Sequence, residues 1–286
     1  MVNIYIYFLF LAAILPIIGL GFFIYAKDVN KEPSSLLAKL FFLGFFSAIP
    51  VVIVEFAVDA LFPTEGVSDF IIIFVNTFFS VALIEEGFKW LVTKKFGYNN
   101  KEFDEIYDII VYSVFASLGF ACIENLLYVF STGFKTAIVR AIFSVPGHAC
   151  FAIVMGYFLS KAKVNNINGS KDLEKKNLLL SVLIPSLAHT AFDAILFYLA
   201  GRIVGSFLVL FFVFYGFLVG ICFGIVGKVS KLQQNLNNNF ATGVLSADSN
   251  GNIQFHPASS TIKYCPVCGR AVQGYHFCPS CGFHID

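Results

Sequence analysis

The chain has 286 residues, of which 58% are hydrophobic and only 13% are charged, and its mean hydropathy is +0.79. A soluble domain usually carries about 25% charged residues, so this composition excludes an ordinary soluble enzyme, a fibrous repeat and a disordered chain. The net charge of +1 gives no overall field that favours nucleic acid, and no nucleic-acid partner is expected. The composition instead indicates a membrane protein that sits in a lipid bilayer.

Seven apolar stretches are long enough to cross a bilayer, because about 20 helical residues span the roughly 30 Å of hydrocarbon. In chain order they are residues 4–26, 36–62, 70–92, 109–130, 136–160, 178–200 and 203–227. All seven are expected to be helices, since an open strand edge cannot face lipid. The first is too long for a cleavable signal peptide. The predicted fold class is therefore all-α, a polytopic membrane helix bundle with about seven transmembrane helices.

The basic residues predict how this bundle is oriented. Fifteen of them lie in the connections after the first, third and fifth stretches and in the tail, whereas the opposite side has only Lys135 and Arg202. Lys and Arg are concentrated in cytoplasmic loops. The chain is therefore predicted to be a multi-pass protein of the cell membrane, with its N-terminus outside and its C-terminus in the cytoplasm.

The chain changes character after the last apolar stretch. Residues 233–260 are rich in Asn, Ser and Gly and contain few large apolar side chains, which is typical of a flexible linker. Three parts are predicted: a transmembrane domain over 1–228, a flexible cytoplasmic linker over 229–263 and a small metal-binding module over 264–286.

Four cysteines in the last part form two C-x-x-C pairs, Cys265 with Cys268 and Cys278 with Cys281. Each pair places two thiolates on one tight turn, and four thiolates suit tetrahedral Zn²⁺. Two disulfides or free thiols are the alternative, but disulfides are rare in the cytoplasm. The pattern therefore predicts a small C-terminal zinc ribbon, whose closed site is structural. The other cysteines are expected to be small packing residues of the bundle: Cys122, Cys150 and Cys222.

Ionisable residues inside the apolar stretches cost about 2.5–3.5 kcal/mol each on insertion scales, so they indicate function. In the third stretch, Glu85 and Lys89 are four residues apart and can pair on one helix face. Glu86 points about 100° away from Glu85, and two adjacent carboxylates in a low dielectric can share a proton or bind a cation. The alternative is a helix end at which Lys89 reaches the cytoplasm and neutralises Glu85. Glu55 and Asp59, near the outer end of the second stretch, are expected to be solvated.

Three later stretches carry further polar groups. Glu124 lies in the fourth, His148 follows a helix-disrupting Pro-Gly pair in the fifth, and His189 and Asp193 share a helix face in the sixth. The Asp193 carboxylate can orient the His189 imidazole and fix its tautomer. By helical rise, Glu124 lies about 9 Å and Glu85 about 23 Å from the outer side, so a single site requires tilted or broken helices.

Four short motifs lie one in each of four consecutive stretches, over about residues 80–200. They are Glu85-Glu86-x-x-Lys89, Phe120-x-x-x-Glu124, the His148 segment after Arg140, and His189-x-x-x-Asp193. Together they resemble the motifs of the PrsW family of intramembrane proteases, which is distantly similar to the prenyl-protein endoproteases and bacteriocin-immunity proteins. The resemblance implies that peptide bonds are hydrolysed in or near the membrane. It implies membrane-anchored protein substrates, and regulatory proteins such as anti-sigma factors are the family's known type.

The resemblance also implies a catalytic site. Its six residues are Glu85, Glu86, Glu124, His148, His189 and Asp193. In that site Glu85 is the general base that activates water, and Glu86 orients the water or a histidine partner. His148 or His189 stabilises the oxyanion or helps to hold the water, and Glu124 completes the polar cavity.

Metal and metal-free chemistry both remain open. Members of the family have been called metalloproteases, and two histidines with up to three carboxylates could bind a second divalent metal that activates water. The chain has no H-E-x-x-H motif, which is the clearest helical signature of a zinc protease. The metal-free glutamate route is slightly preferred.

Two other function classes are alternatives to a protease. Intramembrane acids and histidines also occur in ion or proton-coupled transporters, although the sequence shows no pair of similar halves of the kind that transporters often have. A membrane-anchored sensor or scaffold, whose zinc ribbon binds a cytoplasmic protein partner, leaves the intramembrane acids and histidines unexplained.

Overall fold

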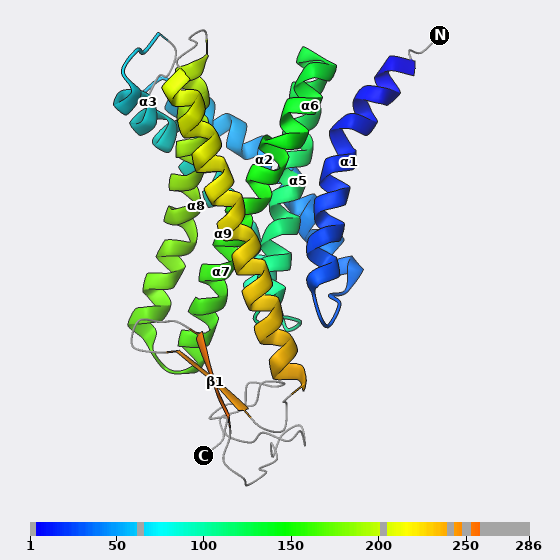
Figure 1. Cartoon of the computed structure of the whole chain (residues 1–286), viewed down its shortest axis with the longest axis vertical. Helices are drawn as coiled ribbons and strands as arrows, with labels where there is room; N and C mark the ends of the chain where they lie inside the picture. The colour runs from blue at the N-terminus through cyan, green and yellow to red at the C-terminus, as the bar shows by residue number, and fades with distance from the viewer. Residues whose placement is uncertain (1–3, 62–65, 201–204, 239–242, 248–252, 258–286) are drawn as a thin grey trace.

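The computed structural model describes residues 4–61, 66–200, 205–238, 243–247 and 253–257, with side chains as far as residue 234. Seven helical spans in these ranges are long and apolar enough to cross a membrane, which confirms the predicted all-helical bundle. The helices run roughly along the long axis of the molecule (Figure 1). The four cysteines of the predicted zinc ribbon lie outside the described residues.

Five of the spans are single helices, and two are interrupted. The single helices are α1 (Ile4–Lys27), α2 (Ser34–Asp59), α5 (Asp108–Thr132), α8 (Lys171–Leu199) and α9 (Gly205–Asn238). The third span consists of α3 (Phe70–Thr77), the π-helical η1 (Phe78–Ala82), α4 (Leu83–Val92) and the π-helical η2 (Thr93–Tyr98). The fifth span consists of α6 (Phe134–Ile142) and α7 (Ser144–Ile167).

Helix α5 forms the centre of the bundle. In its apolar window 78% of the residues are buried, against 22% in α1 and in α9, and it packs on α1, α2 and α7. The peripheral helices instead expose large apolar side chains such as Phe22, Phe56 and Phe217. Such an outer surface suits lipid, because hydrocarbon surrounds it in place of water. The three cysteines predicted to pack inside the bundle are buried and unoxidised: Cys122, Cys150 and Cys222.

The end of the membrane domain differs from the sequence prediction. Helix α9 continues to Asn238, past residue 228, so the first part of the predicted linker over 229–263 belongs to the last helix. Two antiparallel strands, β1 (Gly243–Ala247) and β2 (Ile253–Pro257), follow within the same segment. The polar composition of this segment is typical of a flexible chain, but its two strands, GVLSA and IQFHP, are more apolar than the rest of it and pair through their backbones.

Both interrupted spans carry irregular backbone next to polar residues. The two π-helical turns flank α4, which holds Glu85, Glu86 and Lys89. The break in the fifth span falls at Phe143, just before the predicted Pro-Gly disruption. Pro146 is tolerated in the first turn of α7, where the missing N–H would have no helical partner. Irregular helical turns of this kind are frequent at functional sites.

Two glycines bring α2 and α5 into backbone contact. A Cβ atom added at Gly44 would lie 1.9 Å from the carbonyl oxygen of Ala116, and one added at Gly119 would lie 1.9 Å from the carbonyl oxygen of Phe41. Small residues allow such close approach of helices in membranes. This contact fixes the position of α2 beside the central helix.

Replacement of Gly119 by Ala is expected to lower the free energy of unfolding by at least about 1–3 kcal/mol, the usual cost of overpacking. The added methyl group cannot fit unless α2 moves away from α5. The matched control is Gly216→Ala in α9, because no atom other than its own neighbouring helix backbone lies within 4 Å of the added Cβ there. Thermal unfolding in detergent is the measurement. A Gly119→Ala protein as stable as the Gly216→Ala protein would show that the two helices do not touch.

Candidate active site

One cavity of about 390 Å³ opens among the helices that carry the predicted catalytic residues. Apolar side chains from α2, α5, α7 and α8 line it together with acidic, basic and imidazole groups. Five of the six predicted catalytic residues line it: Glu85, Glu124, His148, His189 and Asp193. The sequence predicted that these residues would lie at different depths unless helices were tilted or broken. The break at Phe143 and the π-helical turns beside α4 provide such breaks.

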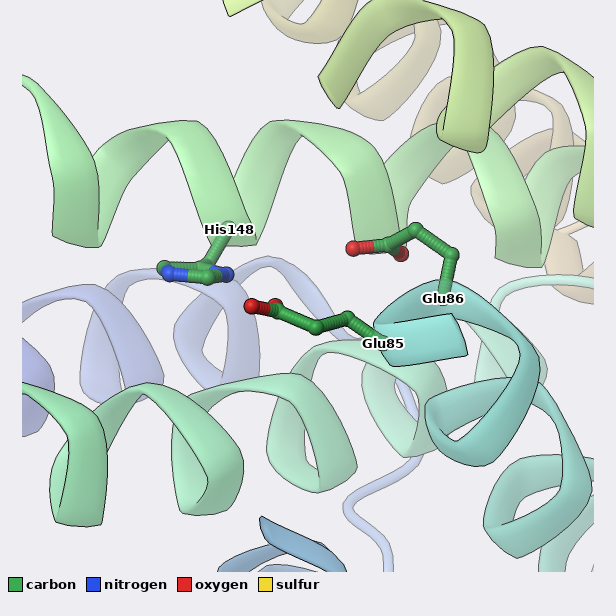
Figure 2. A group of neighbouring side chains, drawn as sticks. All are labelled: Glu85, Glu86 and His148. Carbon is green, nitrogen blue, oxygen red and sulfur yellow. The ribbon is translucent and has the colours of Figure 1, made fainter. Parts of the chain in front are cut away.

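The sixth residue, Glu86, lies behind the cavity wall. Its side chain is fully buried, whereas 9% of the Glu85 side chain is exposed. Figure 2 shows both glutamates leaving α4 and the Glu85 carboxylate directed at the ring of His148. The two adjacent acids therefore have different environments, and Glu85 is the one that can reach water in the cavity.

The ammonium group of Lys89 lies at the centre of the site. Its Nζ donates hydrogen bonds to Glu85 Oε2 and Glu86 Oε1, both at 2.8 Å, and lies 3.1 Å from His148 Nδ1. The side chain is fully buried and packs over the ring of Phe120 at 4.3 Å. The alternative in which Lys89 reaches the cytoplasm is therefore wrong. The predicted pair with Glu85 exists, and Lys89 also neutralises Glu86.

The neighbours of His148 fix the tautomer of its imidazole ring. Lys89 can only donate, so His148 Nδ1 accepts, and Nε2 then carries the proton and lies 2.8 Å from Glu124 Oε2. Ser117 donates a hydrogen bond to the backbone carbonyl of His148 at 3.0 Å. His148 thus holds its N–H group beside Glu124 in the cavity wall, on a backbone that α5 holds in place.

His189 lies between two carboxylates. Its Nδ1 is 3.1 Å from Glu86 Oε1 and its Nε2 is 3.1 Å from Asp193 Oδ2, an arrangement that a protonated ring satisfies with both N–H groups. The ring stacks on Phe151, with centroids 4.7 Å apart. The predicted orientation of His189 by Asp193 is present, and Glu86 adds a second contact.

A polar chain links Glu124 to the first helix. Arg140 Nη2 lies 3.1 Å from Glu124 Oε1, and Arg140 Nε donates to Asn125 Oδ1 at 2.8 Å. Asn125 Nδ2 in turn donates to the carbonyl oxygen of Ala13 at 2.7 Å. Sequence reasoning missed Asn125, although an amide next to Glu124 in an apolar stretch is the signal that could have found it.

Sequence reasoning also placed Glu55 wrongly, because it expected this side chain to be solvated. It lines the same cavity as Glu85 and Glu124, and one of its carboxylate oxygens is buried without a hydrogen-bond partner among the described residues. Asp59, one helical turn further on, is exposed as predicted. Both acids were placed at the surface because they lie near the end of the predicted second span. Glu55 nevertheless lines the cavity.

Comparison with known proteins gives the family. Residues 32–221 match the family model described as PrsW family intramembrane metalloprotease. The chain belongs to the PrsW family. It is therefore an intramembrane endopeptidase, as the four motifs indicated.

Several relatives named Protease PrsW share this similarity. The relative from Oceanobacillus iheyensis is 41% identical over 185 residues, which cover 65% of this chain and 81% of the relative. The relative from Clostridioides difficile is 40% identical, with 66% and 79% covered. The relative from Bacillus subtilis is 35% identical, with 65% and 81% covered. No solved structure matches the chain.

The family description implies a metal, and one group of PrsW site residues has suitable donors. Glu85, Glu86 and His148 offer ligand atoms within 4.8 Å of one another, and two carboxylates with one imidazole suit Zn²⁺. By donor type and spacing, these three residues would hold the ion. The Nζ of Lys89 contacts all three, so an ion there would require the ammonium group to withdraw.

Proposed function

We propose that Glu85 is the general base of this PrsW protease. Of the two adjacent glutamates, only Glu85 faces the cavity. Lys89 contacts its Oε2 atom, which leaves the second carboxylate oxygen available for a water molecule. A carboxylate within hydrogen-bonding reach of water can remove a proton as that water attacks a peptide carbonyl, and can return the proton to the leaving amine. The observation that carries the proposal is the convergence of six acids and imidazoles, the five predicted residues and Glu55, on one cavity.

The groups opposite Glu85 stabilise negative charge on the carbonyl oxygen. His148 and Arg140 both line the cavity, where their N–H groups can turn from Glu124 to an oxyanion and stabilise its charge. Glu124 holds both groups through contacts of 2.8 Å and 3.1 Å. Glu124 is therefore assigned a positioning role. A metal ion at Glu85, Glu86 and His148 would, when bound, supply Lewis-acid activation of water.

Glu86 acts through its neighbours and has no contact with substrate. It is buried behind Glu85 and contacts both Lys89 and His189. These contacts fix the ammonium group that positions Glu85 and the ring that Asp193 orients from the other side. Glu85 is thus the base, His148 and Arg140 are the donors, and Glu86, Glu124 and Asp193 are positioning carboxylates. His189, which Glu86 and Asp193 hold, keeps the role of helping to hold the water that the resemblance implies.

The substrates are membrane-anchored proteins, with single-span regulatory proteins such as anti-sigma factors as the first candidates. A cavity inside a helix bundle is reached most directly by a segment that already lies in the bilayer. We place the N-terminus outside and the C-terminus in the cytoplasm on the distribution of Lys and Arg. The zinc ribbon over 264–286, held by Cys265, Cys268, Cys278 and Cys281, then lies in the cytoplasm, where it can bind a protein partner.

Asp193→Asn is expected to lower kcat for cleavage of a single-span substrate in proteoliposomes by about 10–100-fold, the usual cost of losing a group that orients a catalytic imidazole. KM should stay within twofold, because Asp193 orients His189 and does not bind substrate. The matched control is Asp59→Asn on the exposed end of α2, which should cleave like the wild type. Unchanged kcat in Asp193→Asn would remove His189 from the mechanism. Ion flux that depends on Glu86, without any cleavage, would instead support the transport alternative.

A further inference from the structure

A second cluster of buried carboxylates lies at the opposite end of the molecule from the N-terminus of α1. Asp28 belongs to the connection between α1 and α2, Glu105 precedes α5, and Asp108 is the first residue of α5. Oxygen atoms of the three residues lie within 4.8 Å of one another, and their exposures are 4%, 8% and 0%. The cluster shares no residue with the proteolytic site. We propose that it binds a hard divalent cation, Ca²⁺ or Mg²⁺.

The state of Asp28 points to a ligand that the protein does not supply. Its side chain is almost fully buried and directed into the cluster, yet neither of its carboxylate oxygens has a hydrogen-bond donor among the described residues. Oδ1 of Asp108 is in the same state. A buried acceptor without a partner costs about 1–3 kcal/mol, and more when it is charged. One cation between these oxygens would satisfy all of them.

The remaining polar contacts hold the cluster in place without neutralising it. Asp108 Oδ2 accepts the backbone N–H groups of Asp104 and Glu105 at 3.1 Å and 2.7 Å. Asn30 donates to Glu105. These donors are neutral, so they bring no positive charge to the three carboxyl groups.

The ammonium group of Lys31 does not pair with the carboxylates of the cluster. Lys31 Nζ donates to the backbone carbonyl oxygens of Tyr25 and Asp28, both at 2.6 Å, and forms no ion pair with the Asp28 carboxylate. Glu32, close by, adds a fourth carboxyl group that accepts from the Tyr112 hydroxyl. Burial, followed by the charge of Glu105, raises the pKa of Asp28 to about 6, which agrees with an excess of negative charge at this point.

The donor set selects the class of ion. All the available ligand atoms are carboxylate oxygens, which Ca²⁺ and Mg²⁺ prefer, whereas Zn²⁺ and copper favour imidazole or thiolate. The ligands come from two segments far apart in the sequence, the connection after α1 and the start of α5. A bound cation would therefore fasten the first two helices to the central helix.

The test is thermal unfolding of the full chain in detergent, first in EDTA and then with excess CaCl₂ or MgCl₂. We expect at least one of the ions to raise the Tm of the wild type by several degrees, because a ligand that binds only the folded state stabilises it. Asp28→Asn and Asp108→Asn should lose this shift. Asp172→Asn, an exposed acid at the start of α8, should keep it in full. No shift with either ion, or a full shift in Asp28→Asn, would overturn the proposal.

Two further measurements separate loss of binding from loss of folding and from binding elsewhere. In EDTA, Asp28→Asn should be as stable as the wild type or more stable, because it removes one of several like charges. Tb³⁺ luminescence, excited through the neighbouring Tyr112, should disappear in Asp28→Asn. It should persist in Glu86→Gln, which alters only the proteolytic site. Luminescence lost in Glu86→Gln but retained in Asp28→Asn would place the ion in the proteolytic site and contradict the proposal.

Discussion

Replacement of Glu85 by Gln is expected to reduce the rate of substrate cleavage by about 10²–10⁴-fold, the usual contribution of a general base. Gln has the size of Glu and can still accept a hydrogen bond from Lys89, so the fold should persist. Only the ability to remove a proton from water is lost. The measurement is cleavage of a single-span substrate in proteoliposomes, with the melting temperature of each variant determined in parallel.

Glu102→Gln is the matched control for this experiment. Glu102 is an acid of the same type outside the cavity, and its ion pair with Lys101 at 3.4 Å is largely exposed, so its loss should change cleavage little. If Glu85→Gln and His189→Ala both cleaved at the wild-type rate, the active-site assignment would be wrong. If Glu85→Gln failed only because it unfolded, its melting temperature would have fallen.

Replacement of Lys89 by Met is expected to destabilise the folded protein by about 3–5 kcal/mol. Lys89 is the cation between Glu85 and Glu86, each 2.8 Å from its Nζ, and Glu86 is fully buried. Removing one partner of a buried ion pair leaves an uncompensated charge, and that residual charge accounts for most of the cost. Thermal unfolding in detergent is again the measurement.

The double variant Lys89→Met with Glu86→Gln should recover part of the lost stability, because the buried negative charge is then also removed. Lys101→Met is the control, since 90% of its side chain is exposed and its melting temperature should not change. A Lys89→Met protein with wild-type stability would show that Glu86 is not charged in the folded state.

The membrane spans could be predicted closely because length and apolar content alone decide which segments cross a bilayer. The predicted first span over 4–26 becomes α1 (Ile4–Lys27), and the predicted fourth over 109–130 becomes α5 (Asp108–Thr132). The π-helical turns around α4 leave no mark in composition, because they depend on which carbonyl each N–H group selects. Their positions therefore came only from the structure.

The candidate site was predictable in its membership but not in its arrangement. Charged and imidazole groups are rare in apolar stretches, so Glu85, His148 and His189 could be chosen from sequence. The pairing of Glu85 with Lys89 follows from helical spacing. The contact of Lys89 with His148 and the access of Glu55 to the cavity depend on how helices cross. Tertiary packing sets those contacts, so they could not be predicted from the sequence of any one helix.

The π-helical turns on both sides of α4 determine which face of the third span meets the catalytic cavity. Each residue of a helix advances the side-chain direction by about 100°, and a π-helical turn accommodates one residue more than an α-helical turn. Removing a residue from η1 would therefore rotate Glu85 and Glu86 relative to Phe70 at the start of α3. The one extra residue in a π-helical turn therefore determines how α4 is rotated about its axis. That rotation determines which of the two glutamates meets water.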